Sequence, residues 1–170
     1  MVIRAVTGPP CGGKSTYASG LGGGVVISSG RLIPHDPVIS EILAAGGMYP
    51  NDSYVTDLVL KELERVLGAL TSPVILDGFP RCSSQLRDLH QWCSNNGYQL
   101  DLHVLIVPMV LCRERAKRSN RYEGHDHRSM LWYAVQFHEL IKTAYNLGLQ
   151  WKSVFDSGEK VITVGGIKNG

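Results

Sequence analysis

The sequence predicts an α/β fold in which helices cover a parallel sheet, and two observations support this prediction. Short apolar runs rich in β-branched residues alternate along the chain with segments of helical period. The apolar runs are nearly continuous, as expected for strands that are covered on both faces. A length of 170 residues suits a single domain, and no linker or repeat divides it. The candidate strands are Val2–Val6, Val25–Ile27, Val74–Leu76, Leu102–Val107 and Val161–Val164.

Helices are expected in the intervals between these strands. One helix, with Asn51 or Asp52 as its N-cap, places these residues on one face: Val55, Leu58, Val59, Leu63, Val66 and Leu67. A second helix groups Leu86, Leu89 and Cys93. The longest is expected from about His127 to Leu147, with a face made of Met130, Leu131, Ala134, Val135, His138 and Ile141. His138 is therefore expected in the core or at its border. Shorter helices are expected at Ser15–Leu21 and Val38–Ala45.

The bulk composition narrows the class of partner. The formal net charge is +2, which is too small to indicate a nucleic acid. No apolar run approaches the roughly 20 residues that span a bilayer, and the start of the chain lacks a secretory pattern. We therefore expect a cytoplasmic protein without a membrane partner. Four cysteines (Cys11, Cys82, Cys93 and Cys112) form no C-x-x-C pair, so reduced thiols are expected, with a zinc site as the alternative.

The first motif is a glycine-rich loop. Residues Gly8 to Ser15 match G-x-x-x-x-G-K-[ST], follow a candidate strand and open a candidate helix. Glycines in such a loop let backbone N–H groups approach phosphate oxygens, and Lys14 adds a positive charge. The Ser15 hydroxyl is expected to ligate Mg²⁺, and Thr16 can bond an α-phosphate. The predicted binding set for ATP is Gly8, Cys11, Gly12, Gly13, Lys14, Ser15 and Thr16.

The second motif is V-I-L-D-G-F-P-R at residues 74–81, followed by Gln85. A buried strand ends in Asp77, which can hold Mg²⁺ through water beside the phosphate loop. Arg81 comes after a turn and can bind a phosphate with two hydrogen bonds. The alternative is that Asp77 and Arg81 only pair with each other at the end of the strand.

These motifs resemble the adenylate kinase family of nucleoside monophosphate kinases. The run VILDGFPR-x-x-x-Q is similar to the family signature nearly letter for letter. Ile27 to Gly30 is similar to its I-S-T-G, and Gly46 to Asp52 to its G-x-L-V-P-D element. The order and spacing of all four elements fit over about residues 1–118.

The resemblance implies a fold and a reaction. The fold is a P-loop three-layer sandwich with a five-stranded parallel sheet, forming one kinase domain over residues 1–170. It includes a helical monophosphate-binding segment (about 28–60) and a short lid (about 116–128). The reaction is transfer of the γ-phosphoryl group of ATP to a nucleoside monophosphate, catalysed by positioning and charge. The implied acceptor-binding set is Ser29, Gly30, Arg31, Tyr49, Gly78, Phe79, Arg81 and Gln85.

Gln85 and Ser29 stand where adenine-specific relatives carry glutamine and threonine, so AMP or dAMP is the expected acceptor. A glutamine amide can both donate to and accept from adenine, which gives this expectation a physical basis. The alternatives are a kinase for another small metabolite and a regulatory nucleotide-binding protein with a degenerate kinase site.

The sequence also departs from the family pattern. Pro34 replaces an arginine, and Arg31 is either a substitute phosphate ligand or a solvent-facing residue. Arg115 aligns with the arginine that stacks on the donor base. The family's next arginine falls at Ser119, beside Arg118. The expected catalytic set is Lys14, Arg81, Arg115, Arg118, Arg121 and Arg128, with a solvated basic face as the alternative for the last four.

The family's closing helix has no counterpart after Val161–Val164, which leaves one face of the sheet thinly covered or covered by a partner subunit. We expect a monomer or a homodimer with small-molecule nucleotides as partners.

Overall fold

The computed structural model describes residues 1–34, 52–69, 72–119, 127–158 and 161–164. Within these residues, six strands form one sheet in the order β2-β3-β1-β4-β5-β6. The strands are β1 (Val2–Thr7), β2 (Val25–Ser28), β3 (Val74–Asp77), β4 (Gln99–Ile106), β5 (Trp151–Asp156) and β6 (Val161–Val164). The helices are α1 (Lys14–Gly20), α2 (Ser29–Leu32), α4 (Asp52–Ala69), α5 (Ser83–Asn95), α6 (Met109–Ser119) and α7 (His127–Asn146).

The predicted α/β class is confirmed, and the strand assignment needs one correction. The fifth parallel strand is β5, which the sequence did not indicate, while the candidate at Val161–Val164 forms β6 and runs antiparallel to β5. Only Val154 is fully buried in β5, because the strand lies near the edge of the sheet. Lys152 and Ser153 therefore interrupt the apolar run by which a covered strand is found in a sequence.

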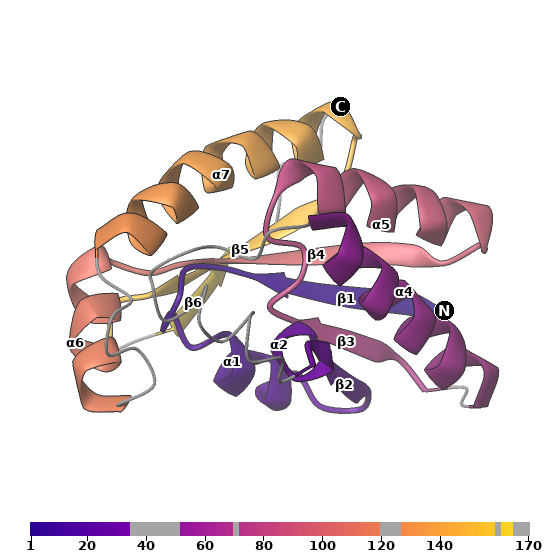
Figure 1. Ribbon diagram of the computed structural model, residues 1–170, viewed down its shortest axis with the longest axis horizontal. Coiled ribbons are helices and arrows are strands. Elements are labelled where there is room, and N and C mark those ends of the chain that lie inside the picture. The colour runs from indigo at the N-terminus through magenta and orange to yellow at the C-terminus, as the bar shows by residue number, and fades with distance from the viewer. Residues whose placement is uncertain (35–51, 70–71, 120–126, 159–160, 165–170) are drawn as a thin grey trace.

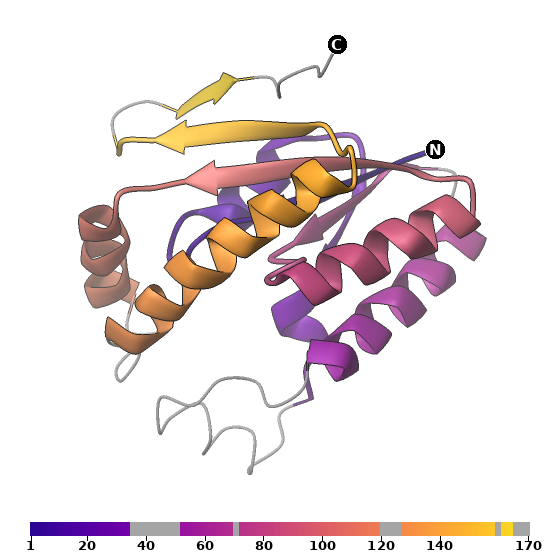
Figure 2. The ribbon, with the colours of Figure 1, turned by 90° about the horizontal axis from the view of Figure 1, so that it is seen from above.

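Two apolar clusters show that the sheet is covered on both faces. In Figure 1, α4, α5 and α7 lie on one side of the sheet and α1 on the other, and Figure 2 shows the first three side by side from above. The larger cluster joins α4, α5 and α7 to residues such as Ala5 and Leu76. The smaller joins α1 and α6 to Val6 and Ile75, the alternate residues of the same strands. The molecule is therefore a three-layer sandwich with one thinner face.

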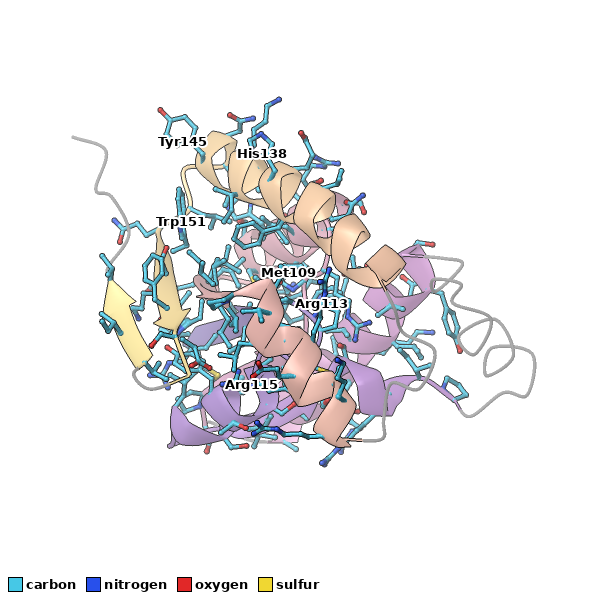
Figure 3. The ribbon with its side chains drawn as sticks, turned by 90° about the vertical axis from the view of Figure 1, so that its left-hand side faces the viewer. Met109, Arg113, Arg115, His138, Tyr145 and Trp151 are labelled. Atoms are coloured by element: carbon cyan, nitrogen blue, oxygen red, sulfur yellow. The ribbon has the colours of Figure 1, made fainter. Side chains whose placement is uncertain are left out.

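The predicted face of the longest helix is partly wrong. Val135 is 62% exposed and His138 is also exposed, and Figure 3 shows His138 on the outer side of α7. Among the described side chains of α7, those that pack on the core are Phe137, Leu140, Ile141 and Ala144. Apolar residues are common around this helix, so periodicity allowed two stripes about 100° apart, and contact with α5 selects one.

The register of the sheet places the functional motifs at its carboxyl edge. Val6 of β1 and Ser28 of β2 are both paired with Asp77 of β3. The loops after these three strands therefore leave the sheet side by side, in the position where parallel α/β sheets bind ligands. No helix in the described part of the chain is long and apolar enough to cross a membrane.

Candidate active site

The loop after β1 has the conformation that its glycines predict. The Gly12 N–H donates to the Pro9 carbonyl at 3.0 Å, which closes a tight turn. Gly13 has a φ of 84°, and a Cβ at Gly8 would lie 2.7 Å from the Cβ of Leu105 on β4. The backbone conformation of Cys11 was not predicted from the sequence. Its φ is 55°, in a region where non-glycine residues are uncommon. The thiol is partly buried, and this burial raises its pKa.

Lys14 joins the phosphate loop to the turn after β3. Its Nζ donates to the carbonyls of Gly8 (3.1 Å) and Pro9 (2.7 Å). Its Cε lies 3.7 Å from the point where a Cβ on Gly78 would be. Desolvation is the main cause that lowers the pKa of Lys14 to about 8, the Arg81 charge adds to it, and Asp77 opposes both. The ammonium thus lies between both motifs and holds its proton less tightly than a surface lysine.

Ser15 and Asp77 meet as a candidate metal site. The Ser15 hydroxyl donates to Asp77 Oδ2 at 2.8 Å, although the two residues are 62 positions apart. Asp77 is only 6% exposed. A hydroxyl and a carboxylate oxygen are the hard ligands that Mg²⁺ prefers, so the donor set fits this ion. Thr16 is exposed at the start of α1.

The turn after β3 is interlocked with the start of α2. The Ser29 hydroxyl, which is buried, donates to the Gly78 carbonyl at 2.9 Å. Arg81 Nε donates to the same carbonyl at 2.9 Å, and its Nη2 lies 3.3 Å from Ser29 Oγ. Gly78 has a φ of 76°, and a Cβ there would come within 3.3 Å of Ser29 Oγ. The structure therefore brings Ser29, Gly78 and Arg81 together, while their binding of an acceptor stays a prediction.

Gln85 makes a contact that the sequence did not suggest. Its side chain is 1% exposed, and its Oε1 accepts from the backbone N–H of Arg81 at 2.8 Å. This bond fixes the backbone from which the Arg81 guanidinium projects. Phe79 is fully buried beneath the same turn. Gln85 thus supports the arginine, while its reading of a base stays a prediction.

The arginines of α6 have different environments. Arg115 Nη2 forms a 2.9 Å ion pair with Asp156 Oδ2 at the end of β5, whereas Arg113 and Arg118 are exposed. Figure 3 labels Arg113 and Arg115 on this helix. Arg115 Nη1 is shielded from solvent and has no hydrogen-bond partner among the described residues. Asp156 escaped sequence analysis because β5 was not recognised. A polar residue at the end of a parallel strand was the only available signal.

Other predicted residues lie at the margin of the described site or outside it. Gly30 and Arg31 are exposed in and around the short helix α2, and Pro34 is exposed just after it. Tyr49, Arg121 and the candidate helix at 38–45 lie outside the described residues. Arg128 belongs to α7, but the described side chains of that helix begin beyond it.

A polar chain beside α1 was also missed. Tyr17 Oη lies 2.9 Å from His103 Nδ1, and His103 Nε2 lies 3.1 Å from Asp101 Oδ2. Lys152 Nζ donates to the same carboxylate oxygen at 2.7 Å. The bond to His103 is the main cause that lowers the pKa of Asp101 to about 2, with Lys152 adding to it. These four side chains link α1, β4 and β5.

Comparison with known proteins supports the resemblance that the motifs indicated. No protein-family model matches the sequence. The chain is 32% identical to adenylate kinase of Pyrococcus furiosus in an alignment of length 110, which covers 58% of this chain and 48% of that protein. It is 32% identical to adenylate kinase of Thermococcus kodakarensis in an alignment of length 112, which covers 59% of this chain and 48% of the relative. The chain thus spans about half the length of the curated relatives it matches.

A solved structure shares the fold. A gluconokinase from Sinorhizobium meliloti 1021 superposes with a TM-score of 0.62 at 18% identity, over 91% of this chain and 82% of that one. The resemblance in sequence to adenylate kinases is therefore confirmed, and the chain shares its overall fold with this gluconokinase structure.

Proposed function

Starting from this similarity to adenylate kinases, we propose that the protein is an ATP-dependent nucleoside monophosphate kinase. It transfers the γ-phosphoryl group of ATP to a nucleoside monophosphate, with AMP or dAMP as the best acceptor. The observation that carries the proposal is the meeting of two motifs at one edge of the sheet. Ser15 of the phosphate loop bonds Asp77, and Lys14 lies against the turn that holds Arg81.

The proposed division of labour follows from charge. Lys14 and Arg81, on opposite motifs, would neutralise the phosphoryl group as it passes between donor and acceptor. Ser15 and Asp77, through water, would hold a Mg²⁺ ion that supplies further positive charge to the phosphate oxygens. Arg115 would bind the donor nucleotide, and the lid would add Arg118, Arg121 and Arg128.

The acceptor preference rests on Ser29 and Gln85. Both are buried beside the Arg81 turn, so an acceptor with its phosphate on Arg81 would place its base near this region. A base that displaces the bonds of these buried groups without replacing them is disfavoured by about 1–3 kcal/mol for each group. Serine in place of threonine removes one methyl of packing, so we expect a modest preference for adenine.

A coupled assay of ADP formation tests the proposal. ATP would be supplied with AMP, dAMP, CMP, UMP, GMP, dTMP or gluconate, or with no acceptor. The proposed function predicts ADP release that depends on a monophosphate, with the highest kcat/KM for AMP or dAMP. A pyrimidine preference would overturn only the adenine assignment. Turnover with gluconate alone would indicate a small-metabolite kinase, and ATP binding without turnover would indicate a regulatory protein.

A further inference from the structure

Asp156, the last residue of β5, lies where three segments meet. Its Oδ2 pairs with Arg115 Nη2 of α6 at 2.9 Å, and its Oδ1 accepts from the backbone N–H of Gly158 at 2.8 Å. A Cβ on Gly13 of the phosphate loop would lie 3.6 Å from Arg115 Nη1 and 3.9 Å from Asp156 Oδ2. The carboxylate therefore connects α6 to the end of β5 and lies close to the phosphate loop.

One nitrogen of the Arg115 guanidinium has no acceptor among the described residues. This nitrogen, Nη1, is shielded from solvent. Such a donor is unfavourable unless an acceptor arrives. Since Nη1 lies beside Gly13, that acceptor would be a group bound on the phosphate loop. The planar guanidinium is held through Nη2, so the direction of Nη1 is fixed before a ligand binds.

The backbone around Asp156 is packed as well. Gly158 has a φ of 92°, and a Cβ there would lie 3.2 Å from Leu111 Cδ2 on α6. The segment after β5 therefore rests on the same helix that carries Arg115. Asp156 is 14% exposed in its side chain, so its two hydrogen bonds are partly protected from water.

We propose that Asp156 is a positioning residue of the ATP site, which holds the Arg115 guanidinium so that Nη1 meets the donor nucleotide on the phosphate loop. The proposal rests on the proposed function for the identity of this ligand. Asp156 acts through Arg115 because a carboxylate beside the phosphate loop repels phosphates by itself. The effect of Asp156 on ATP affinity therefore distinguishes two cases. If the Asp156 carboxylate orients Arg115, it strengthens ATP binding; if it only repels the phosphates, it weakens ATP binding.

The test is a titration of the full chain with a fluorescent ATP analogue, displaced by ATP, without acceptor. Asp156→Ala is expected to raise the Kd for ATP about 10-fold, in the range for loss of a charge-assisted hydrogen bond. Asp156→Asn keeps an acceptor for Arg115 and is expected to raise it about threefold. Asp88→Asn, on the exposed side of α5, is the matched control and leaves the Kd unchanged.

Two further measurements separate positioning from a structural role. If Asp156 acts through Arg115, then Asp156→Ala adds no loss of ATP affinity in an Arg115→Ala background. In the kinase assay, the KM for ATP rises while kcat and the KM for the monophosphate stay within about threefold. If Asp156→Ala does not fold, Asp156→Asn alone and in the Arg115→Ala background gives the same comparison.

Three results would overturn the proposal: ATP binding by Asp156→Ala at wild-type strength or tighter, additive losses in the double variant, or failure of the wild-type chain to bind ATP. The proposed function fails separately, if wild type binds ATP but phosphorylates no monophosphate. In that case the titration still decides the role of Asp156.

Discussion

The turn after β3 and the arginine helix α6 bring positive charge to the same edge of the sheet in different ways. Arg81 is held on its backbone by Gln85 and on its side chain by Gly78 and Ser29. On α6, Arg115 is anchored by Asp156, whereas Arg113 and Arg118 are exposed. Under the proposed function, the first region would be preorganised for a phosphate, whereas the exposed arginines of the second would reach the phosphates only after a nucleotide binds.

The largest expected effect concerns Lys14 of the phosphate loop, which lies against the turn after β3. Lys14→Ala should lower kcat for phosphoryl transfer by at least roughly 10³-fold, because charge on the transferring group goes unmatched. The Tm should change little, since Lys14 bonds only carbonyls of its own loop in the contacts described. Steady-state kinetics and a thermal melt check this, with Lys142→Ala on the exposed side of α7 as the control. Near wild-type turnover would refute the donor site.

The next test asks whether the exposed arginines take part at all. Arg118→Ala should lower kcat by roughly 10²-fold, the effect of losing one charge-stabilising donor. Stability should stay within about 0.5 kcal/mol, because the side chain is exposed. Arg87→Ala on α5 is the matched control for removal of an exposed arginine. Equal kcat values for Arg118→Ala and Arg87→Ala would assign Arg118 to a solvated basic face without a part in catalysis.

Gln85→Ala tests the support beneath Arg81. The truncation removes the acceptor of the Arg81 backbone N–H, so the free energy of unfolding should fall by about 1–3 kcal/mol. The KM for AMP should rise about 10-fold, and the lead of AMP over CMP and UMP should narrow. Denaturant melts and an acceptor series measure both, with exposed Gln91→Ala as the control. A loss of stability with unchanged acceptor selectivity would limit Gln85 to its structural contact.

The smallest effect concerns the Asp101 chain, which lies outside both regions. The pKa of Asp101 is about 2, below its ordinary value of 3.8, so its contribution is present above pH 3.8. It is lost as the pH falls through about 2. Asp101→Asn should destabilise the protein by roughly 1–2 kcal/mol at neutral pH and much less near pH 2. Urea melts between neutral pH and about pH 2 measure this loss of stability, with Asp88→Asn as the control. A loss that does not depend on pH would show that packing, and not ionisation, is responsible.

Sequence reasoning succeeded where one physical requirement dictates a residue, and failed where context decides. Gly8 and Gly78 are required by close approach or by positive φ, so both motifs could be located before the structure. The strand β5 was missed because a strand near the edge has no need of a continuous apolar run. Asp156 is the last residue of β5, so missing this strand left the ion-pair partner of Arg115 out of the predicted site.

The error on α7 has a related cause. Periodicity shows that a helix has an apolar stripe, but only contact with the neighbouring layer decides which of two stripes is buried. Val135 and His138 belong to the stripe that is exposed. Gln85 shows a further limit. The motif identified the residue, while its bond to the Arg81 backbone depends on the shape of the turn.

The two carbonyls that hold Lys14 have a calorimetric consequence. Its ammonium has a pKa of about 8 in the free protein. Phosphates exchanged for the carbonyls of Gly8 and Pro9 would raise that value, because they favour the charged form more strongly. ATP binding near pH 8 would therefore take up a fraction of a proton from the medium. The observed heat of binding would then vary with the ionisation enthalpy of the buffer, in proportion to the fraction of Lys14 that was neutral beforehand.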